Sequence, residues 1–517
     1  MRTETAWRRL SPRMLIVHPF QEVIRTAPLL LGVLIAGTTS GGEGHLWGLA
    51  AAGVMVVLGM SRWFTTTYMI TSEQVQVRRG LLRKRVVTVP MDRIRSVDIT
   101  SNVLHRVLGL ARVEIGTGRS DRKGGGELKL DALQTAAATR LREELLHRTP
   151  ATVGANAPGA PAVPGIGPAA SPPEQEVAAL RPSWIGYGPF TLSGVLTVGI
   201  LGGFVGRVVN EGNVDLRSIS SVRATWDWLN GLSLPAEIAT ITAVLIVFVA
   251  VASTLGYVLA FWNFRLTRPT AGTLHVTRGL ITTRATTLEE RRLRGVELSE
   301  PLLLRAVRGA RLIAVTTGLR VGRGAQRGGS MLLPPAPRAE NERVAAAVLG
   351  GSAALTEPLT AHGPIARRRR FTRAVGLNAV VAALLLMLWL LPTDLYEWTW
   401  ITALALLPFT ALLAADRYRN LGHALTGPYL VTRWGSLVRR RVALERDGIV
   451  GWTVERSFFQ RRAGVVTLTA TTAAGRQSYR VQDIELGPAL DLARAGVPGL
   501  IEPFLVTSGS APARQPA

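Results

Sequence analysis

Two short stretches of this chain define a repeated β-rich unit: residues 75–80 read VQVRRG and residues 274–279 read LHVTRG. In both, apolar and polar residues alternate before a glycine, which is the pattern of a half-buried strand entering a tight turn. Strand-like segments follow each stretch. They are VVTV at 86–89 and VLGLARV at 107–113 in the first case, and RATTL at 284–288 and RGARL at 308–312 in the second.

A third and more diverged copy of this unit lies near the C-terminus. It reads LVTR at 430–433, RRRVAL at 439–444 and AGVV at 463–466. A glycine stands at the expected hairpin turn of every copy: Gly80, Gly279 and Gly435. A closing helix is predicted after each set of strands, at 133–146 with Asp131 as its N-cap, at 338–349 and at 488–494.

Each β-rich unit is preceded by a pair of apolar runs. A bilayer core about 30 Å thick needs about 20 helical residues, and five of the six runs meet this length. The first run is marginal, because its apolar part is short, and a buried soluble helix is the alternative there. The sequence therefore predicts six transmembrane helices in three pairs, at 24–39 and 45–63, 184–204 and 234–262, and 374–391 and 398–415.

The composition agrees with apolar spans in lipid and basic segments in water. Of 517 residues, 47% are hydrophobic, yet the formal net charge is +25. A strongly basic surface implies an anionic partner, and nucleic acid and anionic lipid headgroups are the two candidates. The chain has no cysteine, which excludes disulfides, thiolate catalysis and Cys-based metal sites.

Arginine is in excess on one side of the predicted pairs, and the longer connection at 205–233 balances three arginines against three acidic residues. Four arginines precede the first span and Arg367–Arg370 precede the fifth, whereas the connections at 40–44 and 392–397 contain only acidic charges. Because Arg and Lys mark the cytoplasmic ends of spans, both termini and all large segments are predicted to lie on the cytoplasmic side of a plasma membrane.

The units resemble the bacterial pleckstrin-homology (PH) domains of the YdbS/YdbT-like membrane proteins. The resemblance is carried by 68–71 (YMIT), 75–80, 86–90, 94–97 and 107–113 in the first unit, and it weakens through the second to the third. It implies a bent antiparallel sheet closed by a C-terminal helix, behind a transmembrane pair that longer members repeat. The predicted fold class is therefore membrane α-helical hairpins plus β-rich, PH-like (α+β) cytoplasmic domains.

The predicted domain order alternates hairpins with PH-like units. It is 1–63 (N-terminal arm and hairpin 1), 64–148 (PH-like domain 1), 149–181 (flexible Pro/Ala/Gly-rich linker), 182–263 (hairpin 2), 264–351 (PH-like domain 2), 352–373 (basic linker), 374–416 (hairpin 3), 417–505 (diverged PH-like domain 3) and 506–517 (disordered tail).

Basic residues at the first hairpin of two units are the candidate contacts for an anionic lipid or a partner. They are Arg78, Arg79, Arg83, Lys84 and Arg85 in the first unit and Arg439, Arg440 and Arg441 in the third. Closely spaced arginines can bind phosphate through bidentate hydrogen bonds. The corresponding loop binds phosphates in phosphoinositide-binding PH domains. The alternative, which the residues favour slightly, is a solvated basic face that follows the positive-inside rule.

No pattern of residues predicts an enzyme, a cofactor or a metal. The seven histidines are scattered without carboxylates around them, and the glycine-rich stretch 318–329 lacks phosphate-loop spacing. Charged residues are nearly absent inside the spans, which argues against a transporter. Gly202, Gly203 and Gly256 are candidates for close helix packing, with simple tolerance of lipid contact as the alternative.

The expected function is a non-enzymatic membrane scaffold or regulator that binds anionic phospholipid headgroups or a protein partner at the cytoplasmic face. A smaller membrane protein of the same family is one such partner. The alternatives are a transporter or channel subunit with regulatory PH-like domains, and a membrane-tethered nucleic-acid binder. The second alternative is disfavoured because aromatic residues, which stack on bases, make up only 6% of the chain.

Overall fold

The computed structural model separates the chain into two compact units, Met1–Glu290 and Arg291–Ala517, so the boundary falls inside the second repeat. The structure describes residues 7–9, 11–14, 53, 66–71, 73–79, 85–91, 94, 96–116, 127–138, 141, 175–191, 193–211, 220–269, 272–317, 330–391 and 396–505. The predicted first pair of spans lies almost entirely outside these residues, as do the glycine-rich stretch 318–329 and the predicted tail.

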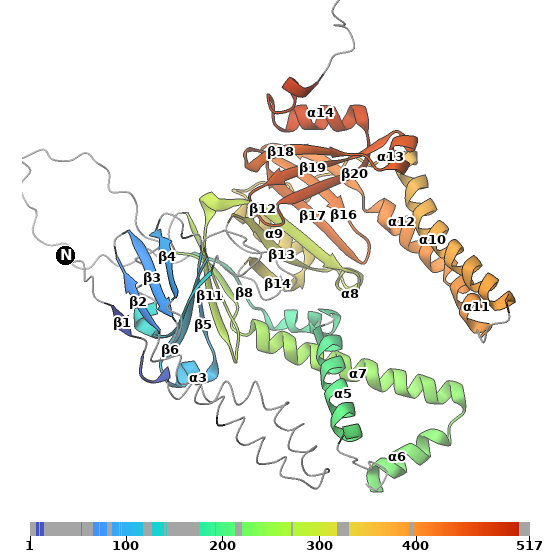
Figure 1. The fold of residues 1–517 in the computed structure, drawn as a ribbon, viewed down its shortest axis with the longest axis horizontal. Helices are drawn as coiled ribbons and strands as arrows, with labels where there is room; N and C mark the ends of the chain where they lie inside the picture. The colour runs from blue at the N-terminus through green and yellow to red at the C-terminus, as the bar shows by residue number, and fades with distance from the viewer. Residues whose placement is uncertain are drawn as a thin grey trace, which may run out of the picture. The chain divides into compact units, whose positions relative to one another are not determined.

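The first unit contains two antiparallel sheets (Figure 1). One has the order β1-β2-β3-β4, with β1 (Arg8–Arg9), β2 (Thr67–Ile70), β3 (Gln74–Arg79) and β4 (Arg85–Pro90). The other has the order β7-β6-β5-β11-β10-β9-β8. Its strands are β5 (Ser96–Ser101), β6 (Leu110–Gly116), β7 (Glu127–Gln134), β8 (Gln175–Ala179), β9 (Arg265–Arg268), β10 (Thr273–Arg278) and β11 (Thr283–Glu289), and the short helix α3 (Val103–Val107) follows β5.

The second unit repeats this design. One sheet has the order β14-β13-β12-β17-β16-β15 and the other the order β18-β19-β20. Their strands are β12 (Leu293–Pro301), β13 (Gly309–Thr316), β14 (Met331–Pro337), β15 (Gly422–Thr426), β16 (Tyr429–Trp434), β17 (Val438–Glu445), β18 (Ile449–Glu455), β19 (Val465–Thr472) and β20 (Ser478–Glu485). Short helices α8 (Leu302–Ala306) and α13 (Phe458–Ala463) follow β12 and β18, as α3 follows β5.

Successive repeats share their sheets. The last three strands of the first repeat, β5–β7, continue into the first strands of the second through the pairing of β5 with β11. In the same way, the last three strands of the second repeat continue into the third through the pairing of β12 with β17. The predicted domain boundaries therefore separate segments of sequence, whereas the hydrogen-bonded sheets cross them.

A segment before each predicted hairpin pairs with the strand just after it. Arg8 and Arg9 of β1 pair with β2, and β8 pairs with β9. A bridge between Thr360 and His423 does the same before the third hairpin. Residues 175–179, predicted as part of a flexible linker, are thus a strand, because their backbone groups complete the edge of β9. Each predicted hairpin is therefore bracketed by two neighbouring strands.

Among the described residues, three helices are long and apolar enough to cross a membrane, by length and composition: Leu234–Phe261, Pro364–Leu390 and Trp398–Arg419. The first is α7, the second is α10, and the third comprises α11 (Trp398–Ala405) and α12 (Leu407–Arg419). Only 6% of the most apolar window of α7 or of α10 is buried. Such side chains exposed to water would carry a large hydrophobic cost, so these helices require an apolar surrounding.

The helix preceding α7 differs from its prediction. Residues 184–204 were expected to form one span, but Pro182–Thr191 form a 3-10 helix, η2, and α5 runs from Ser193 to Glu211. The connection to α7 contains an unpredicted helix, α6 (Ser220–Asn230), with Trp226 and Trp228 exposed.

Close packing between α5 and α7 also involves other glycines than predicted. Gly194 donates its N–H to Ser253 Oγ of α7 at 2.7 Å, whereas a Cβ at Gly202 or Gly203 would have nothing within 4 Å.

The closing helices follow the strands in the second and third repeats. The helix α9 (Arg338–Val348) and the helix α14 (Leu486–Gly496) confirm the predictions at 338–349 and 488–494. The predicted cap of the first is wrong, because Asp131 lies in β7 and forms an ion pair with Arg112 of β6. The helical turn there begins at Thr135, after the strand has ended.

Alternating residues of the strands build the two cores. Val75 and Val77 of β3, which the sequence pattern placed on one face, are fully buried together with Leu110 and Val113 of β6. In the second unit, Val442 and Leu444 of β17 pack in a cluster with Leu468 and Val481. Burying such a side chain contributes about 1.5–3 kcal/mol, so these alternating positions hold each pair of sheets together.

Candidate functional site

The turn between β10 and β11 lies against the end of the membrane-length helix α7. Gly279 donates its N–H to the carbonyl of Trp262 at 2.9 Å, and Leu280 donates to the carbonyl of Leu259 at 3.0 Å. Gly279 has a φ of 108°, and a Cβ there would overlap the carbonyl of Thr282. Only glycine therefore fits this turn, which confirms the predicted role of Gly279.

The short helix α3 of the first repeat lies beside the same turn. Arg106 donates to the carbonyl of Leu280 at 2.8 Å, and the Thr282 hydroxyl donates to Asn102 at 3.1 Å. Around these contacts large apolar side chains are exposed. We call this set the α3 surface, and it consists of Val103 (50% exposed), Val107 (78%), Leu280 (38%) and Ile281 (48%).

An equivalent surface lies at the end of α12. Arg305 of α8 forms an ion pair with Asp416 of α12 at 2.9 Å, and Arg433 of β16 donates to the carbonyl of Arg419 at 3.0 Å. Leu302 donates its N–H to the carbonyl of Leu437, in the turn between β16 and β17, at 2.8 Å. Leu302, Leu303 and Leu437 are exposed here and form the α8 surface.

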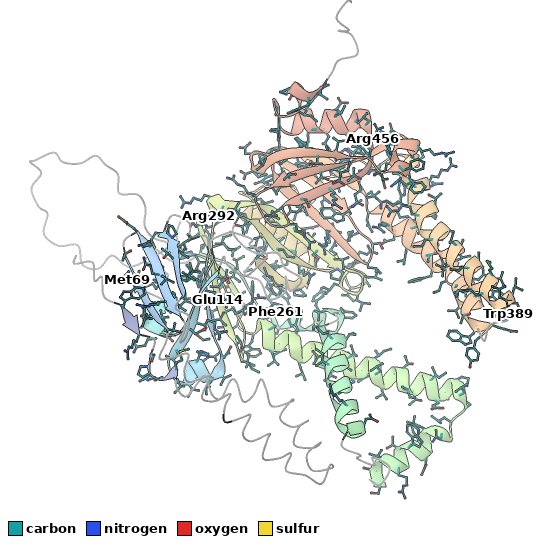
Figure 2. The ribbon with its side chains drawn as sticks, in the orientation of Figure 1. Met69, Glu114, Phe261, Arg292, Trp389 and Arg456 are labelled. Atoms are coloured by element: carbon teal, nitrogen blue, oxygen red, sulfur yellow. The ribbon has the colours of Figure 1, made fainter. Side chains whose placement is uncertain are left out.

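The third short helix, α13, carries the most exposed aromatic pair in this part of the fold. Phe458 is 64% exposed and Phe459 72% exposed. A capping box of Ser457 and Gln460 fixes the start of the helix, and Arg369 of α10 donates to the Ser457 hydroxyl at 3.3 Å. Figure 2 labels Arg456, where β18 leads into α13, near the start of α10, and Trp389 towards the far end of that helix.

Arginines accompany the aromatic pair of α13. Arg456, Arg461 and Arg462 are all exposed, and together with Phe458 and Phe459 they form the α13 surface. Apolar side chains flanked by arginine, held at the end of a membrane-length helix, match the chemistry of the zone between lipid tails and headgroups. Sequence reasoning missed these surfaces, although the leucines after two of the turn glycines, at 280 and 437, were a visible signal.

A buried polar junction connects α10 with the third repeat. Arg369 and Arg370 form ion pairs with Asp483 of β20 at 2.8 and 2.7 Å, and the Asp483 side chain is only 3% exposed. Gln460 of α13 donates to the same carboxylate at 2.9 Å. Two of the arginines predicted to mark the cytoplasmic side thus also fix the helix to the sheet.

Two histidines complete this junction. His362 Nδ1 lies 2.7 Å from the carbonyl of Gln482, so the proton is on Nδ1 and Nε2 accepts from His423 Nδ1 at 3.1 Å. Burial, and then the proximity of His362, lower the pKa of His423 to about 4. Burial also lowers the pKa of His362. Both imidazoles are therefore neutral at pH 7, when they form a hydrogen-bonded pair rather than a charged one.

The predicted basic residues of the third repeat contact protein groups. Arg439 donates to both oxygens of Glu300 in β12, at 2.6 and 2.7 Å, and Arg440 lies 3.6 Å from Glu297. Arg441 is 5% exposed and donates to the carbonyls of Ala354 and Glu357. Burial, and then Arg433 nearby, lower the pKa of Arg441 to about 10. The structure therefore gives these three arginines a role in joining repeats, and lipid contact by them stays a prediction.

The predicted basic residues of the first repeat are described only in part. Arg78 is half-buried in β3, opposite Thr67 of β2 and Val86 of β4. Arg79 and Arg85 are opposite each other where the β3–β4 hairpin closes. Arg83 and Lys84 lie outside the described residues, so their contact with an anionic ligand stays a prediction.

Within the described part of the chain, no group of three or more His, Asp or Glu side chains is arranged to hold a metal ion.

A family model described as "Bacterial PH domain" matches the chain three times, at residues 25–149, 216–350 and 372–495. These matches agree with the repeat seen in the sequence, and each includes residues of a predicted hairpin and the strands after it. No curated protein and no solved structure matches the chain. The finer YdbS/YdbT-like assignment stays a prediction.

Proposed function

This chain belongs to the bacterial PH domain family, and from that premise we propose that it is a non-enzymatic integral membrane scaffold. Six transmembrane helices in three hairpins would hold three tandem PH domains against the cytoplasmic face of the plasma membrane. There the PH domains contact anionic phospholipid headgroups and present a surface for a protein partner. The observation that carries the proposal is the exposed apolar surface at one end of each helix that is long and apolar enough to cross a membrane.

The strand pairing around each hairpin supports this topology. Strand β8 enters the second hairpin and β9 leaves it, and Glu176 lies opposite Thr267 between them. The Thr360–His423 bridge performs the same function for the third hairpin, and β1 with β2 brackets the first. Because the two flanking strands are hydrogen-bonded neighbours, both ends of each hairpin emerge on one side of the bilayer. All three PH domains then lie on that side.

The charge distribution supports the cytoplasmic assignment. Arginines flank the start of α10, and Arg417 and Arg419 lie at the end of α12, so both membrane-facing ends of this hairpin are basic. An arginine next to an anionic leaflet contributes about 1 kcal/mol of attraction. Arg461 and Arg462 add to this on α13, where their exposed guanidinium groups are free to reach headgroup phosphates while the two phenylalanines enter the acyl boundary.

Topology is tested in the intact chain, which has no cysteine of its own. Gly42→Cys and Gly125→Cys are introduced singly, and a membrane-impermeant maleimide is applied to sealed cells. We expect Gly42→Cys to react from outside and Gly125→Cys only after permeabilisation. Labelling of both from the same side contradicts the proposed orientation.

Lipid contact is tested by thermal unfolding of the detergent-solubilised full chain with phosphatidylglycerol or phosphatidylcholine. We expect phosphatidylglycerol to raise the unfolding temperature more, and high salt to remove the difference, because binding to the native state stabilises it and salt screens the attraction. The double substitution Arg461→Gln/Arg462→Gln should reduce the gain. Arg343→Gln on α9, an exposed arginine away from the short helices, is the matched control. Equal gains from both lipids would leave only the protein-partner role.

A further inference from the structure

The two joins between PH domains follow one register. Arg284 of β11 lies opposite Thr100 of β5, and Ala285 lies opposite Ile99. In the second unit Arg440 of β17 lies opposite Ser299 of β12, and Arg441 lies opposite Leu298. The same antiparallel interface has therefore been built twice.

The residues that pair at the two joins have equivalent positions within their PH domains. Arg284 and Arg440 are each paired across the hairpin with the residue just before the turn glycine, namely Arg278 and Trp434. Arg85 has this position in the first PH domain, opposite Arg79. On the other strand, Thr100 and Ser299 are each two residues before the N-cap of the following short helix, Asn102 or Pro301. Glu455 has this position before Ser457.

Two strands that are equivalent to the joining strands have no partner on their outer edge among the described residues. Strand β4 ends the sheet β1-β2-β3-β4, and β18 ends the sheet β18-β19-β20. The first corresponds to β11 and β17, and the second to β5 and β12. The first PH domain therefore has one of the two strand edges that form a join, and the third PH domain has the other, and both edges are unpaired among the described residues.

Exposure differs as expected between joined and unjoined edges. At the second join, Leu298, Ser299 and Glu300 of β12 are at most 2% exposed. On β18 the equivalent positions include Val454, which is 37% exposed, and Glu455, which is also exposed. On β4, Val86 is 52% exposed. An exposed edge with apolar side chains is a template for another strand.

We propose that β18 of one copy of this chain pairs with β4 of a second copy, in the register of the two internal joins. That register places Val454 opposite Val86 and Glu455 opposite Arg85. The first pair brings two exposed valines together, and the second brings opposite charges together. Cross-strand pairs of these kinds contribute roughly 0.2–1 kcal/mol each, in addition to the backbone hydrogen bonds.

The interface is head-to-tail, so each chain uses two different surfaces. Such a contact leads to a ring where the rotation closes and to a filament where it does not, and lateral growth in the plane of a membrane suits a scaffold. The inference names the protein partner of the proposed scaffold as a second copy. It does not depend on lipid binding, so the two are tested separately.

The experiment uses the absence of native cysteine. Full-length Val86→Cys and Val454→Cys chains, carrying different tags, are mixed in detergent and oxidised. Directly opposed cross-strand residues have Cβ atoms about 4.5–5.5 Å apart, within reach of a disulfide. We expect a disulfide-linked heterodimer in the mixture and little in either single variant alone.

The register is tested with a diagonal control. Thr88→Cys lies on the same face of β4 as Val86 and is also exposed, but in the proposed register it is diagonal to Val454. Diagonal residues are about 7–8 Å apart, so cross-linking with Val454→Cys should be on the order of tenfold slower. Equal or faster cross-linking through Thr88→Cys overturns the register, and no heterodimer with either overturns the interface.

A charge on the edge gives a second readout without cysteine. Val454→Lys places a cation opposite Val86 and beside Arg85, and we expect light scattering to show loss of the oligomer to single chains. Val450→Lys, 68% exposed on the same strand, would lie opposite Pro90 at the far end of β4, where the two internal joins have no paired residues, and should leave the mass unchanged. A wild-type chain that is already a monomer, or an oligomer indifferent to Val454→Lys, contradicts the proposal. An intrachain disulfide in the Val86→Cys/Val454→Cys double variant, without dimer, does so as well.

Discussion

Glu300 in β12 accepts two hydrogen bonds from the guanidinium group of Arg439 in β17, at 2.6 and 2.7 Å, although the residues belong to different PH domains. The Glu300 side chain is 3% exposed, and Arg338 lies 3.6 Å away on its other side. A buried carboxylate of this kind must be paired. The ion pair therefore couples the stability of the second PH domain to that of the third.

Glu300→Ala should destabilise the full chain by about 3–5 kcal/mol, because it leaves Arg439 partly buried without its counter-ion. Thermal unfolding in detergent measures the loss. The matched control is Glu340→Ala, which removes the ion pair to the half-exposed Arg343 on α9 and should cost less than about 1 kcal/mol. Similar losses for the two variants would mean that the join contributes little.

Acid should weaken the junction between α10 and the third domain. His423 has a folded pKa of about 4, below the ordinary 6.5, so folding favours its neutral form. The stabilisation is complete above pH 6.5 and is lost progressively as the pH falls towards 4, where the imidazole protonates beside His362.

Unfolding temperatures of the full chain between pH 7.5 and 4.5 measure this effect. We expect the wild type to lose stability across the window and His423→Gln to lose less of it. Asp483 opposes the change, because its carboxylate attracts a charged His362. An unaltered pH dependence in His423→Gln would show that other groups control acid sensitivity.

The α13 surface should lie in the lipid interface. Phe459→Cys, labelled with an environment-sensitive dye in a nanodisc, should show blue-shifted emission that nitroxide-labelled lipid quenches, since interfacial side chains enter the bilayer by about 5–10 Å. Arg343→Cys, on the exposed face of α9, is the control and should stay unquenched. Equal quenching at both positions, or none at 459, counts against the membrane contact.

Helix packing in the second hairpin should depend on Gly194. A Cβ there would overlap Ser253 Oγ and the carbonyl of Val249 in α7, so Gly194→Ala should cost about 1–3 kcal/mol. Gly199→Ala, five residues further along α5, meets nothing within 4 Å. It should be neutral or stabilising by about 0.5–1 kcal/mol, because alanine is the better helix former. Unfolding temperatures that reverse this order would show that α5 and α7 are not in close contact.

Much of the architecture could be predicted from local patterns. The alternation at 75–80 and 274–279 predicted strands with one buried face, and Val75, Val77, Leu274 and Val276 are buried. The apolar run at 234–262 became α7 almost residue for residue. These predictions succeeded because side-chain periodicity and span length are properties of a segment by itself.

The candidate site was predicted less well, because its parts come from separate segments. Arg439–Arg441 were predicted either to contact an anionic lipid or partner or to form a solvated basic face. The sequence does not show that Glu300 and Glu297 lie beside them. Asp131 looked like a helix cap, yet Arg112 and the ladder of β7 hold it in a strand. The sequence does not mark Phe458 and Phe459 as exposed, because exposure is a property of the folded chain.

The sequence by itself determined the repeat, the alternation within strands, the turn glycines and the apolar helices, all of which follow from residues near one another in the chain. Only the tertiary structure decided which strands became neighbours. Sheet pairing depends on backbone hydrogen bonds, which every residue except proline offers alike, so β5 and β11 carry no mark of their partnership. Among the residues that the structure describes, β4 and β18 are each left with one unpaired edge.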